Sequence, residues 1–167
     1  MHPNGHNRRQ YSEAEAYQRL SALCATAEYC KTDILKKMAA WDIDPAGKAQ
    51  ERIISRLERE HFIDEGRYAH AFVRDKFRYN RWGRMRIDRE LRLRGISPDI
   101  IDDALGEISD DDTLEALRRL LTQKRPSVRG KTDYEVKMKL IRFALSRGFE
   151  METIRQVIDN IPDDITE

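Results

Sequence analysis

The 167-residue sequence lacks the features that mark membrane and secreted proteins. It contains no run of about 18 apolar residues, so the sequence predicts no membrane-spanning helix. The polar N-terminus has no apolar segment of the secretory type. Cys24 and Cys30 are the only cysteines, too few for a disulfide framework in a chain of this length. These absences predict a cytoplasmic protein whose thiols stay reduced.

Sequence signals for catalysis and for metal binding are also missing. Glycines occur singly and form no phosphate-binding loop, and the four histidines form no HxxxH or Cys/His pattern. Cys30 lies near a predicted helix start, a position that lowers a thiol pKa. No histidine lies near Cys30 in the sequence, which favours a buried structural thiol over a catalytic dyad. We expect no catalytic residue, no metal site and no cofactor.

The pattern that remains is helical. No alternating run of Val, Ile, Thr and Tyr appears, and no Asn-Gly or Asp-Gly turn joins two such runs. Apolar residues recur at helical spacing nearly throughout. The clearest helix starts are Ser12 with Glu15, which form a capping box, and the cap-plus-proline pairs Asp44-Pro45 and Ser97-Pro98. The sequence predicts nine helices beginning near residues 12, 32, 44, 64, 84, 97, 113, 133 and 150, and therefore an all-α fold.

A shift of 53 residues aligns three parts of the chain. The aligned positions are Ile34, Ile87 and Leu140; Met38, Leu91 and Ala144; Ile43, Ile96 and Phe149; and Asp42, Gly95 and Gly148. A chance alignment of helical hairpins is the alternative, but it does not account for several apolar positions kept in one register twice. The period predicts one three-helix, helix-turn-helix-like unit per repeat. Three such tandem repeats predict an elongated, curved array.

The repeat also divides the chain into expected segments. We predict a disordered N-terminal tail at residues 1–11. Helical repeats follow at residues 12–61, 62–109 and 110–161. The chain then closes with an acidic end at residues 162–167.

Charge is distributed in blocks that the net charge of +1 conceals. Residues 67–94 contain 10 basic and 3 acidic side chains, residues 95–117 contain 8 acidic and no basic ones, and residues 118–147 contain 10 basic and 2 acidic ones. One interpretation is a set of solvated helix faces. The other is a pair of basic patches for a polyanion, separated by acidic segments.

The second interpretation selects a basic face, because arginine suits bidentate contact with phosphates or carboxylates. Phe77, Tyr79 and Trp82 are interleaved with it and could stack on bases or simply belong to the core. The candidate residues for binding DNA or a filament are Arg74, Lys76, Arg81, Arg84, Arg86, Arg89, Arg92, Lys137, Lys139, Arg142 and Arg147.

Three segments resemble the RecX family of recombination regulators: residues 62–73, residues 83–96, and residues 139–149 with the apolar positions that follow. No single motif is specific, but the three occur in order and on a common period. The match covers about residues 15–161. The family motif positions are Asp64, Tyr68, Phe72, Gly83, Ile87, Leu91, Gly95, Ile96, Gly148 and Phe149.

This resemblance implies a non-enzymatic protein of tandem three-helix repeats. It implies binding along RecA–DNA filaments, inhibition of the recombinase and its ATPase, and weak binding to single- and double-stranded DNA, in DNA repair, recombination and the SOS response. We expect a monomer with no membrane association. The sequence departs from the family pattern at Asp42, where a glycine is expected, and at both ends of the chain.

Two other functions remain open from the sequence. A helix-turn-helix transcription regulator would use a recognition helix with polar residues for base edges, and usually a dimer. The basic helices are poor in Asn and Gln, and no dimerisation heptad is visible. A plain helical scaffold without a nucleic-acid role would show no salt-dependent binding to DNA.

Overall fold

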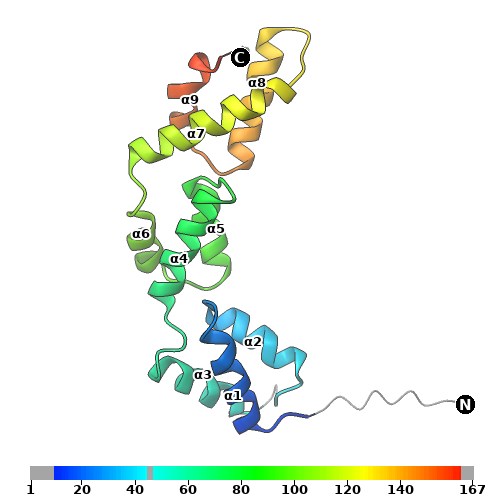
Figure 1. Ribbon diagram of the computed structural model, residues 1–167, viewed down its shortest axis with the longest axis vertical. Helices are drawn as coiled ribbons and strands as arrows, with labels where there is room; N and C mark the ends of the chain where they lie inside the picture. The colour runs from blue at the N-terminus through cyan, green and yellow to red at the C-terminus, as the bar shows by residue number, and fades with distance from the viewer. Residues whose placement is uncertain (1–9, 45–46, 163–167) are drawn as a thin grey trace, which may run out of the picture. The chain divides into compact units, whose positions relative to one another are not determined.

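A computed structural model describes residues 10–44 and 47–162 of the chain. Over these residues the protein is entirely helical, with nine α-helices, two short 3-10 helices and no strand (Figure 1). The predicted all-α class is confirmed, whereas the elongated, curved outline stays a prediction. The helices are α1 (Glu13–Cys24), α2 (Lys31–Ala40), α3 (Ala49–Arg59), α4 (Glu65–Arg78), α5 (Arg84–Leu93), α6 (Pro98–Leu105), α7 (Asp110–Lys124), η1 (Arg125–Ser127), α8 (Asp133–Ser146), α9 (Met151–Val157) and η2 (Ile158–Asn160).

The fold divides into two units, which we describe separately. Unit 1 runs to Tyr68 and unit 2 begins at Ala69, so the boundary falls inside α4. We refer to α1–α3, α4–α6 and α7–α9 as modules 1, 2 and 3. Modules 2 and 3 meet within unit 2.

Helix starts follow the capping residues in the sequence. Ser12 and Glu15 form the predicted capping box of α1, and a second box joins Ser109 to Asp112 at the start of α7. The Asp64 carboxylate accepts the backbone N–H of Arg67 at 2.8 Å ahead of α4. Each cap satisfies a backbone donor that the first helical turn leaves without a partner.

The predicted start of the third helix at Asp44-Pro45 is wrong, because α3 begins at Ala49. The Gly47 N–H donates to the Asp44 carbonyl at 3.2 Å, which closes a turn there. The Gln50 side chain then donates to the Ile43 carbonyl at 2.6 Å. The glycine three residues after Asp44 thus favours a turn over a first helical turn. Pro45 lies outside the described residues.

The 53-residue repeat is visible in the backbone. The N–H groups of Ile43, Ile96 and Phe149 donate to the carbonyls of Met38, Leu91 and Ala144, at 3.0, 3.1 and 3.2 Å. Gly95 and Gly148 adopt left-handed backbone conformations, with φ of 77° and 90°, and Asp42 does the same with φ of 56°. Aspartate tolerates this region better than most residues. The first corner therefore keeps the geometry of the other two despite its aspartate.

Apolar side chains from the aligned positions form the cores. Ile34, Met38 and Ile43 are buried in a cluster with α1 and α3 residues in unit 1. Leu140, Ala144 and Phe149 are buried in a cluster with α7 and α9 residues in unit 2. No helix among the described residues is long and apolar enough to cross a membrane.

Both predicted chain ends fall largely outside the described residues, which exclude 1–9 and 163–167. Tyr11, at the edge of the predicted tail, packs its ring 5.5 Å from that of Trp41. It therefore contributes to the surface of module 1.

Candidate nucleic-acid interface

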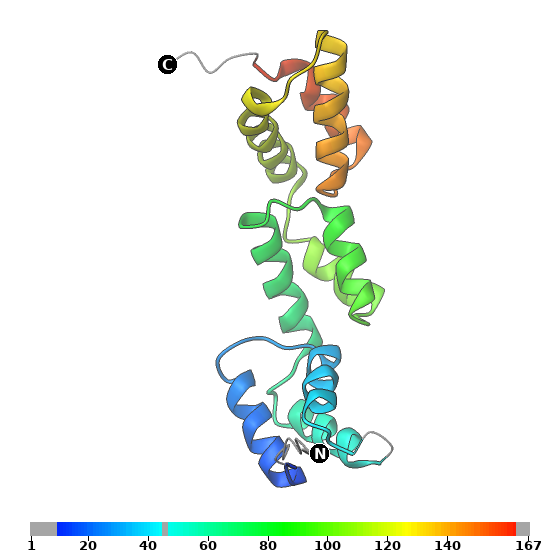
Figure 2. The ribbon, with the colours of Figure 1, turned by 90° about the vertical axis from the view of Figure 1, so that its right-hand side faces the viewer.

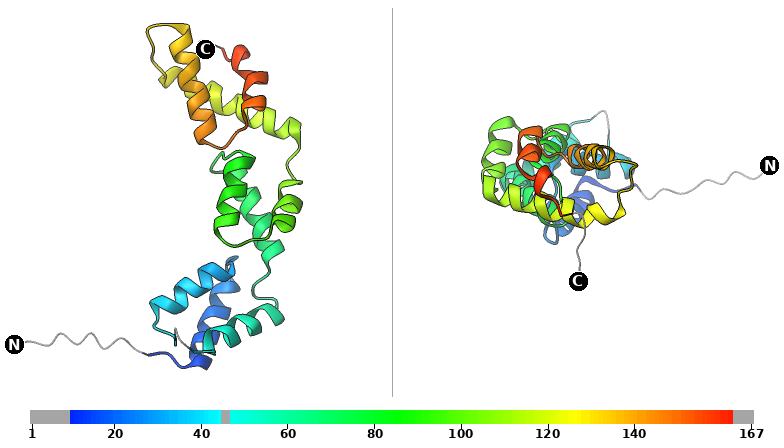
Figure 3. Two further views of the ribbon diagram at one scale, coloured as in Figure 1. Left: turned by 180° about the vertical axis from the view of Figure 1, so that it is seen from behind. Right: turned by 90° about the horizontal axis from the view of Figure 1, so that it is seen from above.

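The C-terminal corner of α8 meets the N-terminus of α5 within unit 2. In the views of Figures 2 and 3, α5 begins where α8 ends. The Gly83 N–H donates to the Arg147 carbonyl at 2.7 Å, and the Met85 N–H donates to the Gly148 carbonyl at 3.1 Å. Backbone N–H groups at the start of α5 thus pair with carbonyl groups at the end of α8. Neither set has a partner within its own helix. This contact sets the geometry of the basic residues around it.

Two glycines make this close approach possible. A Cβ added at Gly83 would lie 2.4 Å from the Gly148 carbonyl oxygen. A Cβ added at Gly148 would lie 2.3 Å from the Cβ and 2.5 Å from the backbone nitrogen of Arg86. Contact between modules 2 and 3 therefore requires glycine at Gly83 and Gly148, two positions of the predicted family motif. The left-handed backbone at Gly148 is a second reason for glycine there.

Arginines cross the junction in both directions. Arg86 of module 2 donates to the Ser146 carbonyl at 3.3 Å, and Arg147 of module 3 donates to the Asn80 carbonyl at 3.2 Å. Arg81 hydrogen-bonds to the Gln123 side chain on α7. These guanidinium groups hold modules 2 and 3 together, so part of the predicted basic face has a structural role.

Aromatic rings lie beneath several of these cations. The Trp82 ring lies 4.1 Å from the Arg86 guanidinium carbon and 5.0 Å from the Lys76 ammonium. Cation–π contacts of this kind stabilise by about 0.5–2 kcal/mol. Trp82 is half-buried, whereas Tyr79 is 80% exposed. Phe77 is half-buried as well, so Tyr79 is the most exposed of these three aromatic residues.

The eleven predicted basic residues do not form one uniform face. Nine of them have partners within the chain, among them Arg74 with Glu107, Arg92 with Asp88, Lys137 with Asp159 and Lys139 with the Arg129 carbonyl. Arg89 and Arg142 are exposed and have no partner among the described residues. These two arginines are the members of the set that form neither an ion pair nor any other contact with the described part of the chain.

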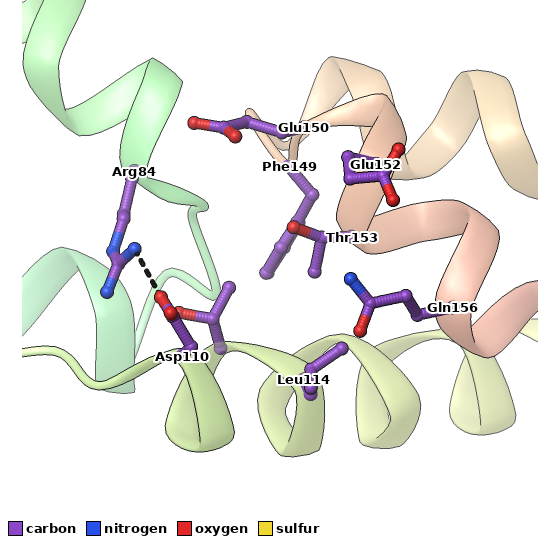
Figure 4. Close-up of a pocket in the computed structure, with 9 residues that line it drawn as sticks. Arg84, Asp110, Leu114, Phe149, Glu150, Glu152, Thr153 and Gln156 are labelled. Carbon is purple, nitrogen blue, oxygen red and sulfur yellow. Dashed lines mark hydrogen bonds and ion pairs between the residues drawn. The ribbon is translucent and has the colours of Figure 1, made fainter.

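A pocket of about 290 Å³ lies on another side of the same junction. Figure 4 shows Arg84 pointing to Asp110, with Glu150 and Glu152 at the α9 end of the pocket. The Arg84 guanidinium lies 2.9 Å from the Asp110 carboxylate and also donates to the Ile108 carbonyl. Since its single cation is paired and its other charges are carboxylates, this pocket disfavours phosphate.

Comparison with known proteins finds a family match for each of modules 2 and 3, the two modules that meet at this junction. The sequence model described as the RecX second three-helix domain matches residues 64–105, and that of the RecX third three-helix domain matches residues 110–158. Regulatory protein RecX of Prosthecochloris aestuarii is 32% identical over 111 residues, which cover 66% of this chain and 71% of the relative. The chain belongs to the RecX family of regulatory proteins.

Regulatory protein RecX of Lactobacillus johnsonii is 30% identical over 121 residues, covering 72% of this chain but 44% of that protein. The chain thus spans about half the length of several curated RecX relatives. A crystal structure of a regulatory protein RecX has a TM-score of 0.80 at 25% identity and covers 89% of this chain and 73% of that one. The tandem three-helix fold is therefore that of RecX.

His70 is a polar residue of this RecX chain whose role the sequence did not predict. Its Nε2 lies 2.8 Å from the Asp103 carboxylate and its Nδ1 lies 2.6 Å from the Glu107 carboxylate. The hydrogen bond to Asp103 raises the pKa of His70, and Glu107 adds to this against the opposing effect of burial. His70 therefore ties α4 to the acidic segment around α6. The acidic block at residues 95–117, with no lysine or arginine of its own, was the sequence signal for such a pairing.

Unit 2 is expected to lose stability as pH rises through the pKa of His70. The pKa is raised in the folded state, so the ion pairs contribute fully below the ordinary value of 6.5 and are lost above the raised one. The melting temperatures of the natural chain and His70→Gln, measured from below pH 6.5 to alkaline pH, should differ most at the acidic end of this range. A difference that widens with rising pH would contradict this assignment.

Cys30 in this RecX chain is buried, and it precedes α2. Burial raises the pKa of its thiol, which favours a structural role. Among the described residues, no group of three or more His, Cys, Asp or Glu side chains is placed to hold a metal ion.

Proposed function

We propose that this chain binds RecA–DNA filaments and inhibits the recombinase and its ATPase, with weak binding to single- and double-stranded DNA of its own. It acts without catalysis or cofactor, as a cytoplasmic monomer. The observation that carries the proposal is membership of the RecX family. The exposed charge of Arg89 and Arg142 beside the module junction supports it, because polyanions are held by such cations.

Titration of the purified chain against RecA on single-stranded DNA tests this function. Steady-state ATP hydrolysis is expected to fall as the chain is added and to recover as salt is raised, since counterion release makes such binding salt-dependent. The same titration with RecA and no DNA is the control. An unchanged ATPase at several-fold molar excess of the chain over RecA would contradict the proposal.

A helix-turn-helix transcription regulator is the less favoured alternative. Helix α5 carries four arginines, two acids and apolar residues but no Asn or Gln, the side chains that read adenine in the major groove. Arginine can read guanine as well as bind phosphate, so α5 offers a narrower set of base contacts than a recognition helix that also carries Asn or Gln. Protection of a single defined sequence in a footprint would reverse this preference.

A further inference from the structure

The 53-residue repeat extends to charged residues at two positions of the second helix in each module. Position one is the first or fifth residue of α2, α5 and α8, and holds Lys31, Arg84 and Lys137. Position two lies five residues later and holds Lys36, Arg89 and Arg142. All six residues are basic. The two positions differ in whether their basic side chains have a partner within the chain.

The cation at the first position is paired in every module. Lys31 lies 2.5 Å from Glu58, Arg84 lies 2.9 Å from Asp110, and Lys137 forms an ion pair with Asp159. Glu58 lies near the end of α3 and Asp159 lies in η2 after α9, whereas Asp110 is the first residue of α7 in module 3. The shared role of this position is to tie the second helix of the module to an acid further along the chain, which accounts for a basic residue there without any external ligand.

The cation at the second position has no such partner. Lys36, Arg89 and Arg142 are all exposed, and none has a hydrogen bond, ion pair or ring contact within residues 10–44 and 47–162. A repeated structural role therefore does not account for the basic charge at this position.

Acidic residues on the same helices do not pair with these cations. Asp133 is the first residue of α8, nine residues before Arg142, and the other four have partners elsewhere. Asp33 accepts the Cys30 N–H at 3.1 Å, and Asp88 lies 2.8 Å from Arg92. Glu90 lies 2.9 Å from Arg94, and Glu135 accepts the Lys131 N–H at 2.8 Å. The second position thus leaves one exposed positive charge, without an ion pair to the described residues, on every module.

We propose that this position provides one phosphate contact per module, through Lys36, Arg89 and Arg142. The inference rests on the proposed binding to nucleic acid and assigns the residues that carry it. Within unit 2, a ligand that is met by the same charge in two successive modules must itself repeat a negative charge, as a nucleic-acid backbone does. Lys36 was not among the residues predicted from the sequence.

The geometry of unit 2 is compatible with contacts to one strand. The Gly83–Arg147 hydrogen bond joins the ends of α5 and α8. Arg89 lies six residues beyond Gly83, and Arg142 lies five residues before Arg147. A helical rise of about 1.5 Å per residue puts their Cα atoms on the order of 20 Å apart along the two helices. A backbone that carries a phosphate about every 3.4 Å per strand in B-DNA offers a contact at this spacing.

The test compares two triple variants with the same change in charge. The first, Lys36→Gln/Arg89→Gln/Arg142→Gln, removes the proposed contacts. The second, Arg56→Gln/Arg118→Gln/Arg155→Gln, removes three exposed arginines that each pair with an acid three or four residues away and that lie outside the predicted basic face. Affinity for a fluorescent thymidine oligonucleotide is measured at several salt concentrations, without RecA. Melting temperatures verify that both variants fold.

The first variant is expected to lower the magnitude of the slope of log K against log salt by about 2, at about 0.7 per single-strand phosphate contact. At 0.1 M salt this corresponds to a loss of affinity of roughly 100-fold. The control variant is expected to keep nearly the natural slope. Equal losses in the two variants would overturn the inference, because net charge alone would then explain binding. An unchanged slope in the first variant would overturn it as well.

Parallel measurements on RecA–DNA filaments separate this inference from the proposed function. Filament binding by the natural chain that survives in the first triple variant, with its salt dependence unchanged, overturns the phosphate contacts and leaves the function standing. Failure of the natural chain to bind filaments overturns the function, while the oligonucleotide slopes still decide the contacts. Loss of filament binding with unchanged oligonucleotide slopes assigns the three cations to a protein surface and overturns the inference.

Discussion

Replacing Gly148 by alanine is expected to destabilise unit 2 by about 3 kcal/mol or more, from the strained backbone and overpacking together. A methyl group there meets the Cβ and backbone nitrogen of Arg86 at 2.3 and 2.5 Å. The φ of 90° is also unfavourable for any residue with a side chain. Urea denaturation followed by circular dichroism measures the loss.

Gly95→Ala is the matched control for this substitution. Gly95 occupies the equivalent corner with φ of 77°, but no atom of its own unit lies within 4 Å of an added Cβ. Its expected cost is that of the left-handed backbone alone, about 1–2 kcal/mol. If the two variants lose the same stability, the contact between Gly148 and α5 does not contribute to the fold.

Replacing Phe149 by alanine is expected to cost about 3–5 kcal/mol, the range observed for buried phenylalanines. Phe149 is 2% exposed and packs in the core cluster formed by α7, α8 and α9. Its ring follows the left-handed Gly148 and fills the corner between α8 and α9, so truncation leaves a cavity that the short α9 helix cannot close. The free energy of unfolding from urea titration is the measurement.

Tyr134→Ala is the control for the phenylalanine variant. Tyr134 lies on α8 and is 71% exposed, and exposed substitutions of this kind change stability by about 0.5 kcal/mol or less. A Phe149→Ala protein as stable as Tyr134→Ala would show that the corner residue does not anchor module 3.

Most of the helices and the repeat could be predicted from the sequence because their determinants are local. Ser12 with Glu15 specifies a cap within one turn, and Gly95 and Gly148 mark corners by their own conformational freedom. The predicted start of the third helix is wrong because Asp44-Pro45 resembles a cap. The hydrogen bond from Gly47 to Asp44 closes a turn there instead, and the helix begins at Ala49.

The partners of the arginines could not be predicted, since each depends on tertiary contact. Arg86 reaches a carbonyl 60 residues away and Arg147 one 67 residues away, distances at which no spacing rule applies. The unpaired positions do have a signal in the sequence, because the 53-residue shift that aligns apolar residues also aligns Lys36 with Arg89 and Arg142.

The hydrogen bonds between Gly83 and Arg147 and between Met85 and Gly148 have a consequence for folding. Separating module 2 from module 3 would leave two backbone donors and two acceptors without their partners, and water would then have to solvate them. What sequence comparison divides into a second and a third domain should therefore behave as a single cooperative foldon, whose halves gain and lose their structure together.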